Sequence, residues 1–272
     1  MVILREIEAK SIVAKTRIPA GDYVINPYIG CPHKCLYCYA EFMKRFTNHH
    51  ETWGDFLDIK RYAKKLNAAR LGDKRVIISS ATDAYNPFEK KYRVTRDILQ
   101  QFVNTQARVC ILTKSDLLLR DIDLFKRIPN ISAAVSLNTL DDSVRKKLEP
   151  FASSVERRIS AIKILHDEGI PTAVFLSPIF PGITDYKAVL LECSSFANEF
   201  WFENLNLRGG YRSAVMRYIR EYHKNLTALY DDIYKHKNIG YWDFLEKEIT
   251  AFCKKNNIAF ISYFYHEKIR KQ

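Results

Sequence analysis

The sequence has no long apolar run. Among its 272 residues, no stretch approaches the roughly 20 apolar residues that a membrane-spanning helix needs, so we expect no membrane partner. The first residues, MVILREIEAKSIVAK, carry charges where a secretory signal peptide is continuously apolar. We therefore expect a cytoplasmic protein. Thiols stay reduced in that compartment, so grouped cysteines indicate metal or cluster ligands rather than disulfides.

Low-complexity segments, fixed-period repeats and Pro/Gly/Ser-rich linkers are also missing. The hydrophobic content of 47% and the aromatic content of 13% are typical of a folded protein and exclude a disordered one. Lysine and arginine number 43 against 31 acidic residues, which gives a net charge of +12. Such an excess favours polyanions as partners, nucleic acid first. The basic residues are spread along the chain, however, and a generally basic surface is the alternative.

A short apolar run followed by an amphipathic stretch recurs six times. The runs are rich in Val, Ile and Phe without strict alternation, which is typical of strands buried on both faces. They cover residues 23–30, 75–82, 108–115, 131–138, 172–180 and 199–207. Helices are predicted at 60–71, 95–105, 118–127, 141–148, 153–168 and 185–198. Six strand–helix units in series predict an α/β fold, a partial (β/α)6 TIM-like barrel over residues 1–208.

The pattern changes after residue 208. Residues 213–236 and 241–257 each predict a helix, and residues 258–264 predict a strand. We expect residues 209–272 to form a C-terminal helical extension packed on the barrel.

Three cysteines lie within eight positions after the first predicted strand: Cys31, Cys35 and Cys38 in NPYIGCPHKCLYCYA. They fall at the carboxyl end of that strand, where β/α barrels hold their active sites. Thiolates at this density bind zinc or an iron–sulfur cluster. Zinc needs a fourth ligand, which nearby histidines can supply: His33, His49 or His50. Three cysteines without a fourth instead suit a [4Fe–4S] cluster with one iron left open.

The other three cysteines are isolated from one another. Cys110, Cys193 and Cys253 lie in apolar strand or helix patterns, where free cysteine behaves as a small hydrophobic residue. The alternative for each is a catalytic thiol that donates a hydrogen atom.

The form Cys-x3-Cys-x2-Cys, with the aromatic Tyr37 before the last cysteine, resembles the radical S-adenosylmethionine (radical SAM) superfamily. The resemblance implies an oxygen-sensitive enzyme whose three cysteines hold a [4Fe–4S] cluster, with S-adenosylmethionine bound to the open iron. Reductive cleavage of that cofactor releases a 5′-deoxyadenosyl radical, which abstracts hydrogen from a substrate. The resemblance also implies an electron donor such as flavodoxin or ferredoxin.

Further segments resemble the spore photoproduct lyase-like branch of this superfamily, whose members are often labelled DNA repair photolyases. The branch includes the mobile pair protein B group, found beside a second radical SAM protein, which the resemblance therefore adds as a partner. The resemblance covers about residues 9–185. It is carried by INPYIGCPHKCLYCYA, SSATDAYNPFEKKYRVTR, LTKSDLLLRDIDLF, SLNTLDD, LEPFASSVERRISAIKIL and SPIFPGITD.

The ends of the second and third predicted strands carry polar residues that the resemblance places around the cofactor. Thr82 and Asp83 stand where relatives hold the methionine amino group, and suitable hydrogen-bond acceptors are present there. The alternative is a turn capped by Asp83. Lys114 ends a buried strand, where an unpaired charge is costly. We expect it to pair with the cofactor carboxylate, or else with a carboxylate of the barrel.

The later strands supply the other cofactor candidates. Ser136 and Asn138 are two residues apart on a strand, so they face the same way and can bond methionine or ribose. Pro181, in PIFPG, belongs to the segment that the resemblance places along the adenine. Tyr37 and Tyr39 can stack or hydrogen-bond there, although Tyr39 can also be a core residue.

The substrate is least defined. Glu203 and Arg208 lie at the end of the sixth predicted strand, near the barrel mouth, and are substrate candidates. Ser80 stands where the true lyase has a cysteine hydrogen donor, and a serine O–H bond is too strong to replace a thiol. This departure argues against thymine-photoproduct repair by that route.

Three functions remain open. The first is a radical SAM enzyme, of lyase or transferase type, acting on a nucleic acid or nucleotide. The second is the same chemistry on a protein or peptide, with a paired enzyme. The third is a non-catalytic zinc-binding nucleic-acid module.

Overall fold

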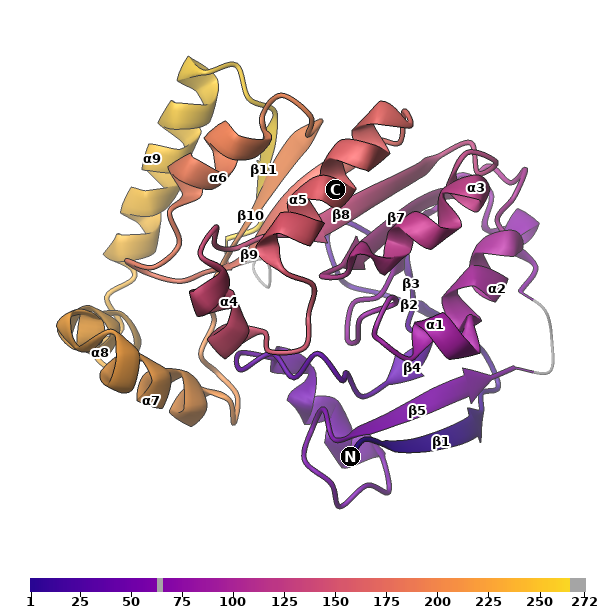
Figure 1. Ribbon diagram of the computed structural model, residues 1–272, viewed down its shortest axis with the longest axis horizontal. Coiled ribbons are helices and arrows are strands. Elements are labelled where there is room, and N and C mark those ends of the chain that lie inside the picture. Colours follow the sequence, from indigo (N-terminus) through magenta and orange to yellow (C-terminus); the bar gives the residue numbers. More distant parts are fainter. Residues whose placement is uncertain (63–65, 265–272) are drawn as a thin grey trace.

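The computed structural model describes residues 1–62 and 66–264, and its main sheet contains part or all of each predicted strand (Figure 1). The strand predicted at 23–30 is divided, because residues 28–29 belong to a second sheet. The strand order is β11-β10-β9-β8-β7-β6-β3-β2, and every pair from β3 to β11 is parallel. The strands are β2 (Val13–Lys15), β3 (Tyr23–Ile25), β6 (Arg75–Ile78), β7 (Arg108–Thr113), β8 (Ile131–Ser136), β9 (Thr172–Ile179), β10 (Glu199–Asn204) and β11 (Phe260–Ser262). Within the described residues β2 and β11 are free edges, so the fold is a partial, unclosed TIM-like barrel.

Helices follow the strands and pack on the outer face of the sheet, as predicted. The α-helices of this part are α1 (Glu89–Tyr92), α2 (Val94–Gln100), α3 (Ile122–Phe125), α4 (Asp142–Leu148), α5 (Val155–Asp167) and α6 (Tyr186–Cys193), and η3 (Asp116–Asp121) is a 3-10 helix. Helix α5 shows why they form: the Ser154 hydroxyl accepts from the Arg157 N–H at its start. Its buried stripe, which includes Ile162 and Leu165, packs towards β8 and β9.

The predicted helix at 60–71 is wrong in its first part. Residues Phe56–Arg61 form strand β5, which pairs in parallel with β1 (Ile3–Glu8) and antiparallel with β4 (Tyr28–Ile29) in a second, three-stranded sheet. Only η2 (Ala68–Leu71), a 3-10 helix, is helical, and residues 63–65 lie outside the described residues. The partners of β5 lie about fifty (β1) and about thirty (β4) residues upstream, so a local pattern cannot reveal the pairing.

The helix predicted at 213–236 is two helices. Helix α7 (Arg212–Tyr222) ends at His223, whose φ and ψ of −137° and 53° are not helical, and η4 (Lys224–Leu226) leads into α8 (Thr227–Tyr234). Helix α9 (Gly240–Lys255) follows. Strand β11 then pairs in parallel with β10, so the residues after 209 add a strand to the barrel sheet as well as helices. None of the helices in the described residues is both long and apolar enough to cross a membrane.

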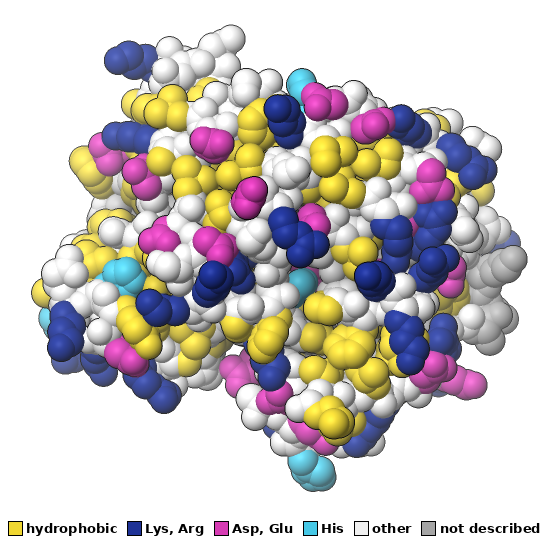
Figure 2. All heavy atoms as spheres, in the orientation of Figure 1, with side chains coloured by type: hydrophobic (Ala, Val, Ile, Leu, Met, Phe, Trp, Pro, Cys, Tyr) yellow, Lys and Arg dark blue, Asp and Glu magenta, His cyan; other side chains and the backbone are white. Residues whose placement is uncertain are grey.

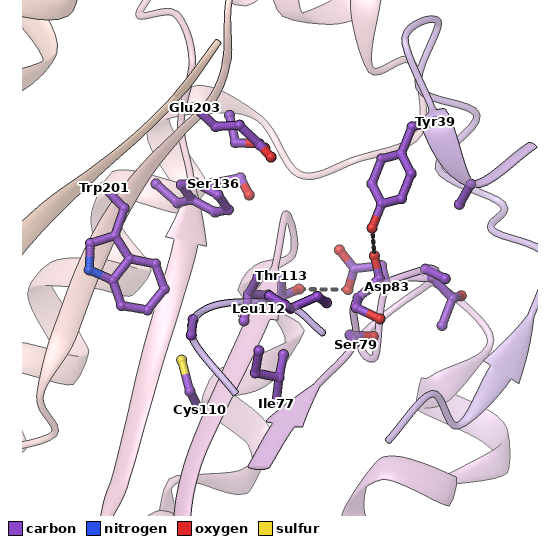
Figure 3. A pocket seen from close by; sticks show the side chains of 18 of the residues that line it. Tyr39, Ile77, Ser79, Asp83, Cys110, Leu112, Thr113, Ser136, Trp201 and Glu203 are labelled. Atoms are coloured by element: carbon purple, nitrogen blue, oxygen red, sulfur yellow. Dashed lines mark hydrogen bonds between the residues drawn. The ribbon is translucent and has the colours of Figure 1, made fainter. Parts of the chain in front are cut away.

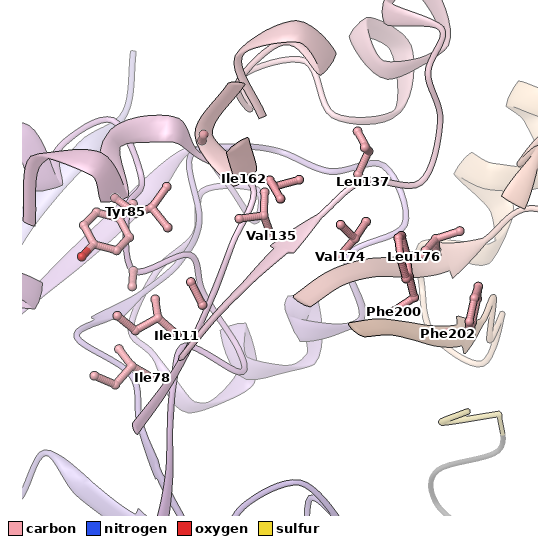
Figure 4. Packing of buried hydrophobic residues seen from close by; sticks show 14 of the residues in the cluster. Ile78, Tyr85, Ile111, Val135, Leu137, Ile162, Val174, Leu176, Phe200 and Phe202 are labelled. Atoms are coloured by element: carbon pink, nitrogen blue, oxygen red, sulfur yellow. The ribbon is translucent and has the colours of Figure 1, made fainter. Parts of the chain in front are cut away.

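The two faces of the sheet pack differently. The outer face carries the main core, in which strand residues such as Val135 and Val174 meet helix residues such as Ile162 (Figure 4). Each fully buried aliphatic side chain of this kind contributes about 1.5–3 kcal/mol. The inner face carries only a small cluster around Ala134, Ala173 and Trp201. This sparse inner face is where the cavity described next lies.

Candidate active site

A cavity of about 970 Å³ runs along the inner face of the barrel sheet (Figure 3). It extends from the cysteine loop, at the carboxyl ends of the strands, down to Arg75 and Arg108, the first residues of β6 and β7. All three clustered cysteines line it, as do most of the site residues predicted from the sequence.

The cysteine loop, between β4 and η1 (Tyr39–Phe46), is held by a glycine and an aromatic cluster. Gly30 has φ +88°, and a Cβ there would lie 2.4 Å from the Phe56 carbonyl oxygen, so only glycine fits before Cys31. Cys31 packs in a small buried cluster with Trp53 and Phe56. The Trp53 indole N–H donates to Cys38 Sγ at 3.2 Å. The loop therefore presents its thiols from a rigid base.

The three thiols are free and buried or half-buried. Burial raises the pKa of each of them, that of Cys31 to about 12. A thiolate in such surroundings needs a neutralising cation, which coordinated iron provides. No three His, Cys, Asp or Glu side chains in the described residues converge as the ligands of a single ion do. A four-iron cluster has no need of that convergence, because it binds its thiolates on separate iron atoms.

The histidines considered as zinc ligands differ in how their ring nitrogens are engaged, and His33 Nε2 is buried without a hydrogen-bond partner in the described residues. His33 Nδ1 lies 2.9 Å from the Phe151 carbonyl oxygen, and its Nε2 lies 3.5 Å from Asp83. The two ring nitrogens of His49 lie 2.8 Å from carboxylate oxygens of Glu51 and Asp58. His50 is exposed. His49 therefore has no nitrogen left for a metal.

Asp83 ties three segments together. Its carboxylate accepts hydrogen bonds from the Tyr85 N–H, the Thr113 hydroxyl and the Lys114 N–H. Burial acts to raise the pKa of Asp83, but His33 and these hydrogen bonds lower the pKa to about 2. The capped turn is thus present, and Asp83 also lines the cavity. Thr82, its neighbour, lines the cavity and donates to the Gly30 carbonyl oxygen at 2.7 Å.

Lys114 lines the cavity beside the cysteine loop. Its ammonium lies 5.7 Å from the centre of the Tyr37 ring and forms no ion pair with a carboxylate of the described residues. Burial acts to lower the pKa of Lys114, but Glu149 and its other anionic neighbours outweigh burial and raise it. The site therefore holds a cation whose charge can meet an anionic ligand.

The remaining predicted residues divide into two groups. Ser136, Tyr37, Tyr39 and Glu203 line the cavity, and Tyr39 is 54% exposed, so it is not a core residue. Its hydroxyl donates to the Ser80 carbonyl oxygen, and Glu203 accepts from the Ser177 hydroxyl. Three predicted residues lie outside the lining: Asn138, Pro181 and Arg208. Asn138 instead donates towards Tyr37 and Glu149 in the layer beneath the cysteine loop.

The extra cysteines also divide. Cys193 and Cys253 are fully buried in the main core, as the packing interpretation predicts. Cys110 is half-buried and lines the cavity.

Two further cavity residues were missed as candidates. Ser79 has φ +77°, and its buried hydroxyl has no hydrogen-bond partner in the described residues. The Trp201 indole nitrogen is likewise buried and has no hydrogen-bond partner in the described residues. Trp201 and Glu203 are two residues apart in EFWFEN, so on a strand they lie on the same face. This alternation could have identified Trp201 as a cavity residue from the sequence. No sequence signal marks Ser79, because its backbone conformation depends on the surrounding fold.

Comparison with known proteins identifies the class. Residues 25–190 match the family model of the radical SAM superfamily. An uncharacterized protein of Methanocaldococcus jannaschii is 36% identical over 253 residues, which cover 92% of this chain and 93% of the relative. The chain belongs to the radical SAM superfamily. It is an enzyme of the kind that uses a [4Fe–4S] cluster with S-adenosylmethionine and needs an electron donor.

Two other similarities are more distant. A radical SAM Nalpha-GlyT isomerase of Pseudomonas phage M6 is 30% identical over 173 residues, 60% of this chain and 34% of that protein. A structure of spore photoproduct lyase complexed with dinucleoside spore photoproduct aligns with a TM-score of 0.59 at 14% identity, over 79% of this chain. This chain spans 65% of that lyase. At this identity the alignment establishes a shared fold.

The residues present fit these cofactors. Three free thiols in a buried loop are the donor set that iron–sulfur clusters take. Beside them, Lys114 offers a cation without an ion-pair partner in the described residues, and the Ser79 hydroxyl is an orphaned buried polar group. Both suit a ligand that carries a carboxylate and other polar atoms, as S-adenosylmethionine does.

Proposed function

We propose that this radical SAM enzyme abstracts hydrogen from a nucleic acid or nucleotide. Cys31, Cys35 and Cys38 hold the cluster, and Lys114 pairs with the carboxylate of S-adenosylmethionine. Bound in this way, the two cofactors supply a 5′-deoxyadenosyl radical at the cavity. The protein's own part is to position the substrate and to exclude water.

The observation that carries the choice of substrate is an aromatic and basic strip at the cavity mouth. It lies on η1 and consists of Tyr39, Phe42, Arg45 and Phe46. The three aromatic side chains are exposed, Phe46 to 66%, and the first two also line the cavity. The Arg45 guanidinium lies over the Phe42 and Phe46 rings, 5.4 and 4.6 Å from their centres.

A second hollow continues from this strip. It has a volume of about 550 Å³ and shares Tyr39, Phe42 and Tyr211 with the main cavity. Its charged lining includes Glu41 as well as Lys44 and Arg45. A strand of nucleic acid that crosses it has cations for its phosphates and can place one nucleotide at the cavity.

The physical basis is the way in which proteins bind single strands. Exposed aromatic rings stack on successive bases, each stacked base contributing about 1–3 kcal/mol, while cations follow the phosphates. The net charge of +12 adds a long-range attraction. Figure 2 shows basic side chains spread over the visible face among acidic ones. The proposal therefore depends on stacking of bases on the aromatic side chains of η1 rather than on a basic patch. The dinucleoside ligand of the structurally similar lyase agrees with this substrate class.

Binding of fluorescein-labelled single-stranded DNA and RNA tests the proposal. We expect affinity to fall with added salt and to drop by at least about thirtyfold in Phe42→Ala/Phe46→Ala, because two stacked bases are lost. The control is Phe244→Ala on α9, which is similarly exposed at 63% but lies outside both hollows. The reaction itself is followed as deuterium transfer from labelled nucleotides into 5′-deoxyadenosine. Transfer from a peptide alone, or no binding of either nucleic acid at low salt, would contradict the proposal.

A further inference from the structure

The cysteine loop has an outer side as well as the side that lines the cavity. An enzyme of this superfamily needs an electron donor, and the electron has to reach the cluster that the three cysteines hold. A cavity of about 970 Å³ cannot admit a protein. Electron transfer through protein slows steeply with distance. A protein electron carrier must therefore approach from outside, at the exposed surface nearest to the cysteines.

That surface is formed by Lys34, in the loop between Cys31 and Cys35, and by the connection between α4 and α5. Phe151 in this connection is 57% exposed, and the Lys34 ammonium lies 5.5 Å from the centre of its ring. Lys34 also forms an ion pair with Asp55. Neither Lys34 nor Phe151 lines the cavity. The outer side of the loop thus presents an exposed aromatic ring with a cation beside it.

Backbone hydrogen bonds hold this connection against the loop. The Phe151 N–H donates to the His33 carbonyl oxygen at 3.4 Å, and the Phe151 carbonyl oxygen accepts from His33 Nδ1 at 2.9 Å. At the end of α4, the Leu148 carbonyl oxygen accepts from the Leu36 N–H at 2.8 Å. These bonds lie on both sides of Cys35. A partner in contact with Phe151 is therefore one layer of residues away from the cysteines.

A second pair of an aromatic ring and a lysine continues this surface. The Lys147 ammonium, in the last turn of α4, lies 4.3 Å from the centre of the Tyr222 ring on α7, which is 49% exposed. Figure 1 shows α4 next to α7. The neighbouring Lys146 lies 3.5 Å from Asp142, whereas Lys147 forms no ion pair within residues 1–62 and 66–264. The charge of Lys147 is therefore open to a partner.

The charges and rings of this surface define the partner. The net charge of +12 attracts an acidic protein over a long range, and Lys147 offers that protein a cation at the contact. Exposed aromatic rings suit the centre of an interface, and lysines suit its rim. Electron-transfer partners need only a small contact, below about 1,200 Å² in total, because they bind briefly. An acidic carrier such as flavodoxin or ferredoxin has these properties.

We infer that Lys34, Lys147, Phe151 and Tyr222, called here the outer face, form the docking site of an acidic electron-carrier protein. The docked carrier gives up one electron, a flavodoxin passing from hydroquinone to semiquinone, and the cluster takes it up by passing from the 2+ to the 1+ state. No covalent bond forms in this step. The inference does not rest on the proposed function, because the same electron is needed whichever substrate the enzyme has.

The test measures carrier binding and carrier-driven reduction separately. A flavodoxin and a ferredoxin are titrated into the anaerobic, cluster-loaded protein by isothermal titration calorimetry. We expect Phe151→Ala to weaken binding of the carrier at least about fivefold, the loss that marks an important interface residue. Lys147→Glu should weaken it similarly at low salt and less at high salt, because salt screens the lost attraction.

The second readout is formation of 5′-deoxyadenosine without substrate, driven either by the reduced carrier or by dithionite. Dithionite is a small ion that needs no docking site. Both variants should therefore lose carrier-driven cleavage while dithionite-driven cleavage stays near that of the unmutated protein. Should Phe151→Ala take up less iron, Lys147→Glu decides alone.

Two control variants match these changes at other sites. Phe244→Ala on α9 removes a ring that is exposed to 63%. Lys187→Glu on α6 makes the same change of charge, and Lys187 likewise lies beside aromatic rings, 5.6 Å from that of Tyr186 and 5.8 Å from that of Phe252. Both controls should bind the carriers as the unmutated protein does.

Four results would overturn the inference. One is that neither carrier binds at low salt, and another is that the outer-face variants bind the carriers as tightly as the controls do. A third is a loss of cleavage that is equally large with dithionite at unchanged carrier affinity. The last is that Lys147→Glu weakens binding of oligonucleotides but not of the carriers, which would assign the outer face to nucleic acid.

Discussion

Glu149 and Arg158 form an ion pair that is sealed from solvent, with 2.5 Å between carboxylate and guanidinium and side chains only 0% and 1% exposed. Tyr37, which lies between two of the clustered cysteines, donates its hydroxyl to Glu149. Arg158 also donates to the carbonyl oxygens of Ser153 and Ser136 at 2.9 and 3.1 Å. The pair therefore links helix α5 and strand β8 to the base of the cysteine loop.

Arg158→Met should lower the free energy of unfolding by about 3–5 kcal/mol, because it leaves Glu149 charged and unpaired in the interior. Iron content after anaerobic reconstitution should fall as well, since the Tyr37 anchor is disturbed. Urea unfolding and iron analysis measure the two effects. Arg157→Met is the matched control, because this neighbouring arginine is 65% exposed and pairs with Asp116 at the surface. Equal effects in the two variants would show that the buried pair has no special role.

Asp83→Asn should remove stability that depends on pH. The pKa of Asp83 lies at about 2 in the folded protein, below the ordinary value of 3.8, so its charged form favours folding. This contribution, about 2 kcal/mol, is complete above the ordinary value and is lost as the pH falls through 2. Urea unfolding of the cluster-free protein between pH 6 and pH 3 should show the difference between variant and unmutated protein shrinking on acidification. Asp73→Asn, at an exposed site, should show no such trend.

Gly30→Ala should destabilise the cysteine loop by more than about 1 kcal/mol, because the new Cβ meets the Phe56 carbonyl oxygen and φ is +88°. We expect a lower melting temperature together with a lower iron content. Gly169→Ala separates the clash from the backbone strain, because Gly169 has φ +72° but no atom within 4 Å of the new Cβ. If Gly30→Ala retains full iron content, the position of Cys31 does not depend on this glycine.

Trp53→Phe should lower the reduction potential of the cluster. The indole N–H bonded to Cys38 Sγ offsets negative charge on the sulfur and so favours the reduced, more negative state. A redox titration followed by electron paramagnetic resonance measures the potential, and Trp242→Phe should leave it unchanged. An unchanged or higher potential in Trp53→Phe would refute this role.

The parallel strands could be predicted because each is a continuous apolar run, and the cysteine loop because its spacing is local. Strand β5 could not, because its pairing with β1 joins segments about fifty residues apart. Nor could the link from Tyr37 to Glu149, which are 112 positions apart. Lys114 was expected at the cavity from its place at a strand end, whereas the orphaned groups of Ser79 and Trp201 emerge only from the packed interior.

Segments from early and late in the described chain line the same cavity. Residues 18–20, ahead of β3, and Tyr263, after β11, all contribute to its lining. On the ribosome the three cysteines are therefore made more than two hundred residues before the wall that completes their surroundings. Until β11 pairs with β10, the cysteine loop is present but the part of the cavity wall that includes Tyr263 is missing. Maturation of this enzyme thus has an order: the cavity is completed by the last part of the barrel to be synthesised.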